Sequence, residues 1–217
     1  MKYIYAPGCA LVVYKPHLAE RLKEVVEAHY SQMPTLLSCC FNRPELDADT
    51  CIITPCSTCR EQYRKHYPQC STLYFLKELA ESSDFEFPDY RGAQMSIQDT
   101  CSGRTDDEYL STVRRLLQRM NIEIVEAEKS GRRGKCCGQA LYGKLPIEKV
   151  ERFMIQRAEE MPCQDVVVYC ASCIQSMTVG GRRPRYLLDL LFGEQTTIAK
   201  ADIVAWNQSL VDFRKKY

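Results

Sequence analysis

Thirteen cysteines dominate this sequence of 217 residues, and ten of them form two copies of one pattern. Each copy has a lone cysteine, then an adjacent Cys-Cys pair, then a Cys-x-x-Cys motif. The first copy comprises Cys9, Cys39, Cys40, Cys56 and Cys59, and the second comprises Cys101, Cys136, Cys137, Cys170 and Cys173. Five thiols in one set exceed the four ligands of a structural zinc site. The pattern therefore favours iron–sulfur chemistry, because cysteine thiolates hold iron–sulfur clusters.

Composition narrows the class of protein. The chain is 45% hydrophobic, which is enough for a core without disulfides, and its formal net charge is +1. That balance gives no argument for binding nucleic acid or a membrane surface, and no apolar run approaches the length of a membrane span. We therefore expect a cytoplasmic protein. Thiols stay reduced in that compartment, so spaced cysteines indicate metal or redox chemistry more often than disulfides.

Short apolar, β-branched runs alternate with helical patterns, which predicts an α/β fold with largely parallel sheets. The predicted strands are Lys2–Tyr5, Thr35–Leu37, Thr50–Thr54, Met95–Asp99, Ile122–Ala127 and Asp165–Tyr169. The predicted helices are Pro16–Tyr30, Ser57–Tyr67, Ser71–Glu81, Asp106–Arg119, Ile147–Met161, Ala171–Thr178, Arg185–Phe192 and Asp202–Arg214. Thr105 and Glu108 predict a capping box before the fourth of these helices.

Every cysteine motif of the two copies follows a predicted strand. Because ligands of open α/β sheets bind beyond the carboxyl ends of the strands, we expect all six motifs to lie at such an edge. We also expect two similar βαβ-type halves, residues 1–90 and residues 91–217, since Pro88 and Gly92 interrupt the pattern between them. The second half carries the C-terminal helices and a long helix, Ile147–Met161, between its Cys-Cys and Cys-x-x-Cys motifs. The first half lacks that helix and is shortened.

These motifs resemble the cysteine-rich CCG domain family, which includes a subunit of heterodisulfide reductase and iron–sulfur subunits of glycolate and lactate oxidation systems. The elements that carry the resemblance are Pro7-Gly8-Cys9, Ser38-Cys39-Cys40, Cys136-Cys137-Gly138 and the motifs Cys56-Ser57-Thr58-Cys59 and Cys170-Ala171-Ser172-Cys173. The resemblance covers most of the chain, from about Tyr3 to Cys173. Ten cysteines in this order are specific, whereas a single Cys-x-x-Cys motif is not.

The resemblance implies an iron–sulfur oxidoreductase, or a catalytic or electron-transfer subunit of one, that acts on thiols and disulfides. Each five-cysteine set would hold a non-cubane [4Fe–4S] cluster, and Cys136 and Cys137 would be the catalytic positions. Electrons would come from a redox partner, either a ferredoxin-like protein or a flavoprotein subunit. Phe41 stands where the family has glycine after the first Cys-Cys pair, so the first set is left open between a cluster, a zinc ion and no metal.

Other interpretations stay open at this stage. A zinc- or cluster-stabilised interaction or assembly module without turnover is the alternative to an enzyme. Basic residues near the second set either offset the charge of a cluster or substrate, or lie on a solvated surface; they are Arg132, Arg133, Lys135, Arg182, Arg183 and Arg185. Gln98 and Asp99 precede Cys101 and are candidates for hydrogen bonding to the site. The three cysteines outside the repeat, Cys51, Cys70 and Cys163, are interpreted as small buried hydrophobic residues.

Overall fold

The structure is a computed structural model that describes residues 1–37, 43–198 and 202–216. The chain divides into two compact units. One unit comprises Met1–Leu79 with Val204–Tyr217, and the other comprises Ala80–Ile203. This grouping follows contacts rather than sequence repeats, so the repeat boundary between residues 90 and 91 stays a prediction.

Each unit contains one sheet, and every strand pairing within it is parallel. The first sheet has the order β1-β2-β3 and the second has the order β5-β4-β6-β7. The strands are β1 (Lys2–Tyr5), β2 (Thr50–Thr54), β3 (Ser71–Tyr74), β4 (Ala93–Gln98), β5 (Ile122–Ile124), β6 (Asp165–Val168) and β7 (Arg183–Tyr186).

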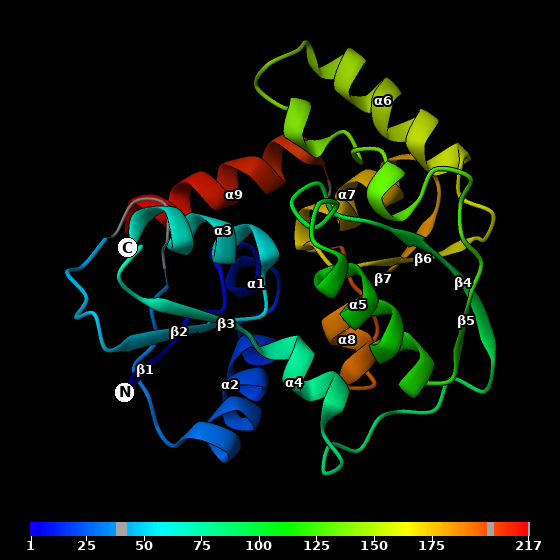
Figure 1. Cartoon of the computed structure of the whole chain (residues 1–217). Coiled ribbons are helices and arrows are strands. Elements are labelled where there is room, and N and C mark those ends of the chain that lie inside the picture. Colours follow the sequence, from blue (N-terminus) through cyan, green and yellow to red (C-terminus); the bar gives the residue numbers. More distant parts are fainter. Residues whose placement is uncertain (38–42, 199–201, 217) are drawn as a thin grey trace. The chain divides into compact units, whose positions relative to one another are not determined.

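Helices connect these strands, as parallel pairing requires. They are α1 (Cys9–Tyr14), α2 (Pro16–Tyr30), α3 (Ser57–His66), α4 (Phe75–Glu81), α5 (Asp107–Arg119), α6 (Ile147–Glu159), α7 (Ala171–Val179), α8 (Leu187–Leu191) and α9 (Ile203–Lys216), with the 3-10 helices η1 (Gly131–Arg133) and η2 (Gln139–Leu141). In the first unit, α2 and α3 lie on opposite sides of the sheet (Figure 1). In the second unit, α6 packs against α7. The predicted α/β class is confirmed.

Several predicted elements need correction. The helix predicted over Ser71–Glu81 begins with a strand, β3, and only its second part is the helix α4. Likewise the helix predicted over Arg185–Phe192 overlaps the strand β7 before α8 begins. Both missed strands are the last in the order of their sheets and run directly into a helix. No turn residue separates strand from helix there, so local sequence gave no signal of the change.

Two predicted strands are shorter in the structure. In the predicted strand Thr35–Leu37, only Thr35 is paired, through an isolated parallel bridge to Tyr5. The strand predicted over Ile122–Ala127 ends at Ile124 in β5. The predicted capping box at Thr105 is also wrong, because the carboxylate of Asp106 caps α5 by accepting a hydrogen bond of 3.1 Å from the Tyr109 amide.

The two sheets repeat one arrangement. The bridge at Thr35 lies beside β1 in the first unit, and β5 lies beside β4 in the second. On the other side of β1, the first sheet continues with β2 and then β3. On the other side of β4, the second sheet continues in the same way with β6 and then β7. A Cys-x-x-Cys motif begins the helix after β2 and the helix after β6. Residues 43–49 contain no helix, whereas α6 occupies the corresponding place in the second unit.

In each unit, core packing holds a segment that carries or adjoins the cysteines. In the first unit, Cys59 belongs to a buried cluster with Ile52, Tyr63 and Tyr67. In the second, one face of α6 is apolar and buried, with Val150, Met154 and Ala158 on it. Burial of this face holds α6 on the unit at the level of the Cys136–Cys137 loop.

Candidate metal and redox site

The five cysteines of the second copy lie beyond the carboxyl ends of β4, β5 and β6, as predicted. Cys101 follows β4, and Cys136 and Cys137 lie in the loop between η1 and η2. Cys170 is the N-cap residue of α7, and Cys173 lies in the first turn of that helix. Three segments far apart in the sequence therefore deliver thiols to one end of the sheet.

The sulfurs of these five residues form a continuous series of contacts. The thiol of Cys173 donates to Cys137 Sγ across 3.3 Å. Cys136 is hydrogen-bonded to both Cys101 and Cys137, and Cys173 also contacts Cys170. Cys137 and Cys173 are buried, Cys136 and Cys170 are half-buried, and Cys101 is exposed.

Hydrogen bonds among these thiols lower the pKa values of some of them and raise those of others. Hydrogen bonds from Cys101 and then from Cys137 lower the pKa of Cys136 to about 2, and the Gly138 amide, 3.4 Å from its sulfur, acts in the same direction. The thiol of Cys173 lowers the pKa of Cys170 to about 7. The pKa values of the donors Cys101 and Cys173 rise correspondingly. Metal binding needs thiolates, so two sulfurs of the set are already favoured in that form.

The backbone at Gly138 shapes the Cys-Cys loop. Gly138 has φ +98°, in the left-handed region that favours glycine. A Cβ atom there would lie 2.8 Å from Met154 Cγ of α6, which is closer than real contacts allow. Glycine at this position thus lets the chain turn sharply after Cys137 and approach α6 closely.

Gln98 and Arg157 hold the same loop from the other side. The amide of Gln98 donates to the carbonyl oxygen of Lys135 at 2.9 Å, immediately before Cys136. Arg157 of α6 donates from Nε to Gln98 Oε1 at 2.6 Å and from Nη2 to the Lys129 carbonyl at 3.1 Å. Arg157 is only 2% exposed, so these contacts and an ion pair of 2.7 Å with Glu160 replace water around its charge.

The expectation that Gln98 hydrogen-bonds near the site agrees with these contacts, and Asp99 accepts hydrogen bonds from Tyr169 and Gly131. The sequence pattern did not reveal Arg157, because its long side chain reaches back from a helix whose pattern indicated only an apolar face. The signal available in the sequence was a charged residue, Arg157, directly before Ala158 on that face.

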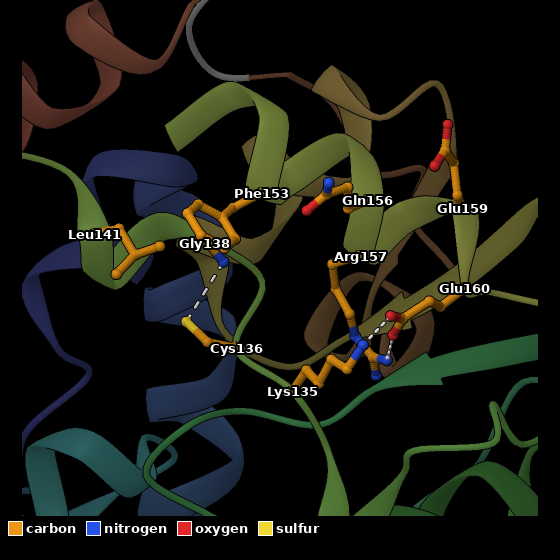
Figure 2. A pocket seen from close by; sticks show the side chains of 9 residues that line it. All are labelled: Lys135, Cys136, Gly138, Leu141, Phe153, Gln156, Arg157, Glu159 and Glu160. Carbon is orange, nitrogen blue, oxygen red and sulfur yellow. Dashed lines mark hydrogen bonds and ion pairs between the residues drawn. The ribbon is translucent and has the colours of Figure 1, made fainter. Parts of the chain in front are cut away.

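A pocket of about 750 Å³ opens beside Cys136. Its lining residues are Lys135, Cys136, Gly138, Leu141, Phe153, Gln156, Arg157, Glu159 and Glu160. Figure 2 shows the Cys136 sulfur on the side of Leu141 and Phe153, with the ion pairs of Glu160 to Lys135 and Arg157 on the other side. Of the cysteines in the described ranges, Cys136 alone lines this pocket. A small molecule in the pocket would have one charged wall and one apolar wall, with the sulfur atom on the apolar side.

All six basic residues predicted near the site bind the protein's own acceptors. Arg132 pairs with Asp107, and Lys135 pairs with Glu160. Arg183 and Arg185 pair with Asp165 at 2.6 and 3.5 Å. Arg182 and Arg133 donate to backbone carbonyl groups of Ala158 and Glu128. Lys135 is the one of these six residues that lines the pocket.

Three cysteines of the first copy come together in the first unit. Cys9 begins α1 after β1, Cys56 is the N-cap residue of α3, and the Cys59 amide donates to Cys56 Sγ at 3.4 Å. A Cβ atom on Gly8 would lie 3.0 Å from Cys59 Sγ, so the loop before Cys9 passes directly beside Cys59. Cys39 and Cys40 fall outside the described residues.

Arg214 of α9 is a further residue at the first site. Its Nη2 lies 3.8 Å from Cys9 Sγ. Nothing in the sequence pattern of this helix singles out Arg214.

The cysteines outside the repeat take different positions. Cys51 is buried on β2, which agrees with its interpretation as a small hydrophobic residue. Cys70 and Cys163 are half-buried instead. Cys51, Cys70 and Cys163 are all free thiols.

The spacing and placement of the second set agree with a comparison against protein families. The family model of the cysteine-rich domain, CCG, matches residues 95–178. This stretch is a CCG domain. The match contains all five cysteines of the second copy and the whole of α6. The first copy lies outside the matched residues.

Two comparisons with individual proteins add context to the CCG domain. The chain is 28% identical over 114 residues to a "Probable membrane-anchored ferredoxin" of Chromohalobacter salexigens, an alignment covering 49% of this chain and 17% of that protein. A solved structure, Picrophilus torridus aspartate racemase, aligns over 99% of this chain and 98% of its own with 11% identity and a TM-score of 0.37. That TM-score does not establish a shared fold. No helix in the described parts of this chain has the length and apolar character needed to cross a membrane.

The donor set of the CCG domain is chemically suited to an iron–sulfur cluster. Within residues 1–37, 43–198 and 202–216, no three His, Cys, Asp or Glu side chains are grouped as ligands of one metal ion. The five sulfurs instead follow one another in a series, all of them soft thiol donors of the kind that iron–sulfur clusters require.

Proposed function

We propose that the CCG domain holds an iron–sulfur cluster through Cys101, Cys136, Cys137, Cys170 and Cys173 and carries out redox chemistry on a thiol or disulfide. The observation that carries this proposal is the series of five contacting thiols at one end of the sheet. An iron–sulfur cluster supplies one-electron transfer when bound. A non-cubane [4Fe–4S] type and heterodisulfide reductase-like activity are the finer form of the proposal, and they rest on the resemblance of the ten cysteines.

The pocket beside Cys136 supports a small-molecule substrate. Leu141 and Phe153 offer contact for an aliphatic group next to the sulfur, and the ion pairs of Glu160 keep the opposite wall polar. Reduction of a disulfide takes up two electrons and two protons and releases two thiols. The electrons come from a redox partner, for which we propose a ferredoxin-like protein or a flavoprotein subunit, and the protons come from water.

The first unit is proposed to hold a second site at Cys9, Cys39, Cys40, Cys56 and Cys59. The approach of Cys9, Cys56 and Cys59 to one another supports it. Arg214 beside Cys9 adds a cation that favours a thiolate. The alternatives at this site are a zinc ion or no metal, as in an assembly module without turnover.

A spectroscopic titration tests the proposed pocket. Anaerobically purified protein is titrated with 2-mercaptoethanol or its disulfide, and electron paramagnetic resonance is recorded in oxidised and dithionite-reduced forms. The account predicts that the thiol changes the spectrum of the wild type. Phe153→Trp narrows the pocket and should raise the thiol concentration needed by about tenfold, which corresponds to ~1.4 kcal/mol of binding free energy.

The matched control is Ile155→Trp, on the same helix but not among the pocket-lining residues. Both positions are partly exposed, at 47% for Phe153 and 40% for Ile155, so both accept a larger ring without disturbing the core. Ile155→Trp should titrate as the wild type does. If the cluster spectrum of the wild type does not change when thiol or disulfide is added, the substrate proposal is refuted.

A further inference from the structure

The carboxylate of Asp99 joins three chain segments at the base of the candidate site. Asp99 directly follows β4 and is 0% exposed. Its Oδ1 accepts hydrogen bonds from the Tyr169 hydroxyl at 2.7 Å and from Arg114 Nη1 at 3.1 Å. Its Oδ2 accepts hydrogen bonds from the Gly131 amide at 2.6 Å and from Arg114 Nη2 at 3.1 Å. Four donors thus converge on one buried side chain.

Each connection leads to a different cysteine loop. Asp99 itself stands two residues before Cys101. Tyr169 immediately precedes Cys170, and Gly131 begins η1 in the loop that continues to Cys136. Through these bonds one side chain fixes the starting points of all three loops that carry the second set of thiols.

An ionised carboxylate satisfies every one of these partners. Its two oxygens accept all four hydrogen bonds and donate none. An asparagine would turn one oxygen into an NH2 group. The Tyr169 hydroxyl can reverse its hydrogen bond, but the Gly131 amide and the Arg114 guanidinium can only donate. An amide at this position therefore leaves a buried donor facing another donor.

Arg114 balances the charge and is itself held in place. Its side chain is 22% exposed and also pairs with Glu126 at 2.7 Å. Glu126 thus contacts the same guanidinium as Asp99 does. The hydrogen bonds of the Glu126 carboxylate go to Arg114 and not to a cysteine loop, which makes Glu126 the natural control.

We propose that Asp99 is a positioning residue, whose buried carboxylate sets the geometry of the loops carrying Cys101, Cys136–Cys137 and Cys170. The importance of that geometry for a cluster rests on the proposed function, but the positioning itself is a property of the metal-free chain. Hydrogen-bonding partners behind metal ligands typically change metal affinity by about 10- to 100-fold when they are removed.

The experiment compares wild type, Asp99→Asn, Tyr169→Phe and Glu126→Gln. Amide hydrogen exchange is followed by mass spectrometry in the metal-free protein, over residues 131–138 and residues 170–173. Iron binding is then measured on reconstituted protein. Asp99→Asn should speed exchange in both segments by about tenfold or more and weaken iron binding by about 10- to 100-fold. Glu126→Gln should leave both quantities as in the wild type.

Tyr169→Phe keeps the test decisive if Asp99→Asn does not fold. The variant removes only the hydroxyl and keeps the ring, which packs against Tyr109 with centroids 5.4 Å apart. It should speed exchange in residues 170–173 and leave residues 131–138 unchanged. Wild-type exchange around Cys170 in Tyr169→Phe would overturn the proposal. Failure of every protein to bind iron would count against the proposed function and leave the exchange result standing.

Discussion

Cys136 is the residue on which the candidate chemistry converges. It accepts hydrogen bonds from Cys101 and Cys137, and its sulfur lines the pocket beside Phe153. A thiolate is the form of cysteine that acts as nucleophile and metal ligand. The structure therefore places the most acidic thiol of the set where a small molecule has access to it.

This acidity predicts an unusual pH dependence in the metal-free protein. Because hydrogen bonds from Cys101 and Cys137 lower the pKa of Cys136, the thiolate persists as the pH falls. We expect its alkylation by iodoacetamide to have nearly the same rate at pH 5 as at pH 8. An ordinary thiol, with a pKa of about 8.5, loses roughly tenfold in rate for each unit of pH below that value. Peptide mass spectrometry after timed quenching measures the rate at this one site.

Two substitutions at Cys101 distinguish the effect of its hydrogen bond to Cys136 from the effect of the thiol group itself. Cys101→Ala removes the donor and should raise the pKa of Cys136, so that its alkylation slows in acid. Cys101→Ser keeps an O–H donor and should preserve the acid-stable rate. A rate in the wild type that falls tenfold for each pH unit would show that Cys136 is not held as a thiolate.

At the scale of the element, the junction between the Cys-Cys loop and α6 sets where these sulfurs lie. Gly138 turns the chain with a positive φ, and Met154 of α6 packs where a side chain on Gly138 would stand. This contact ties the loop that carries the most acidic thiol to a helix of the core. A substitution at Gly138 should therefore change both the free energy of unfolding and the positions of the two neighbouring cysteines.

Gly138→Ala tests this junction. The new methyl group would meet Met154 at 2.8 Å while the backbone stays in a left-handed conformation. We expect a loss of about 2–4 kcal/mol in the free energy of unfolding, from strain in the backbone together with displacement of α6. Urea denaturation followed by circular dichroism measures the loss.

The matched control is Gly143→Ala. Gly143 also has a positive φ, +75°, but a Cβ atom there has no neighbour within 4 Å. This variant should lose only about 1 kcal/mol, the cost of the backbone conformation alone. Equal losses in the two variants would mean that the contact with Met154 contributes nothing.

Element prediction from the sequence succeeded where pattern and burial agree. The apolar face of α6 and the buried strand β2 have clear periodicity or a continuous apolar run, and both lie where predicted. The strands β3 and β7 were missed because each is a four-residue strand joined directly to a helix, and β7 contains Pro184. The position of Asp99 among three loops could not be predicted from the sequence either, because its partners Arg114, Gly131 and Tyr169 are set by tertiary structure.

At the scale of the whole molecule, the two units repeat one plan. Each unit places a lone cysteine after one strand and a Cys-x-x-Cys motif at the start of a helix after another. The units differ before the Cys-x-x-Cys motif, since the described residues 43–49 of the first unit contain no helix, whereas the second unit has α6 there. The repeat of cysteines was readable from the sequence, and the repeat of strand order became clear only from the pairing of β3 and β7.

The central claim is that the second set of cysteines holds an iron–sulfur cluster, and its most direct test is metal and sulfide content. Iron, zinc and acid-labile sulfide are measured per chain after anaerobic purification of wild type, Cys170→Ala and Cys56→Ala. The account predicts that Cys170→Ala loses about four iron and four sulfide per chain relative to the wild type. Cys56→Ala loses a similar amount only if the first set also holds a cluster. Zinc without sulfide in the wild type would contradict the account and leave a structural metal protein in its place.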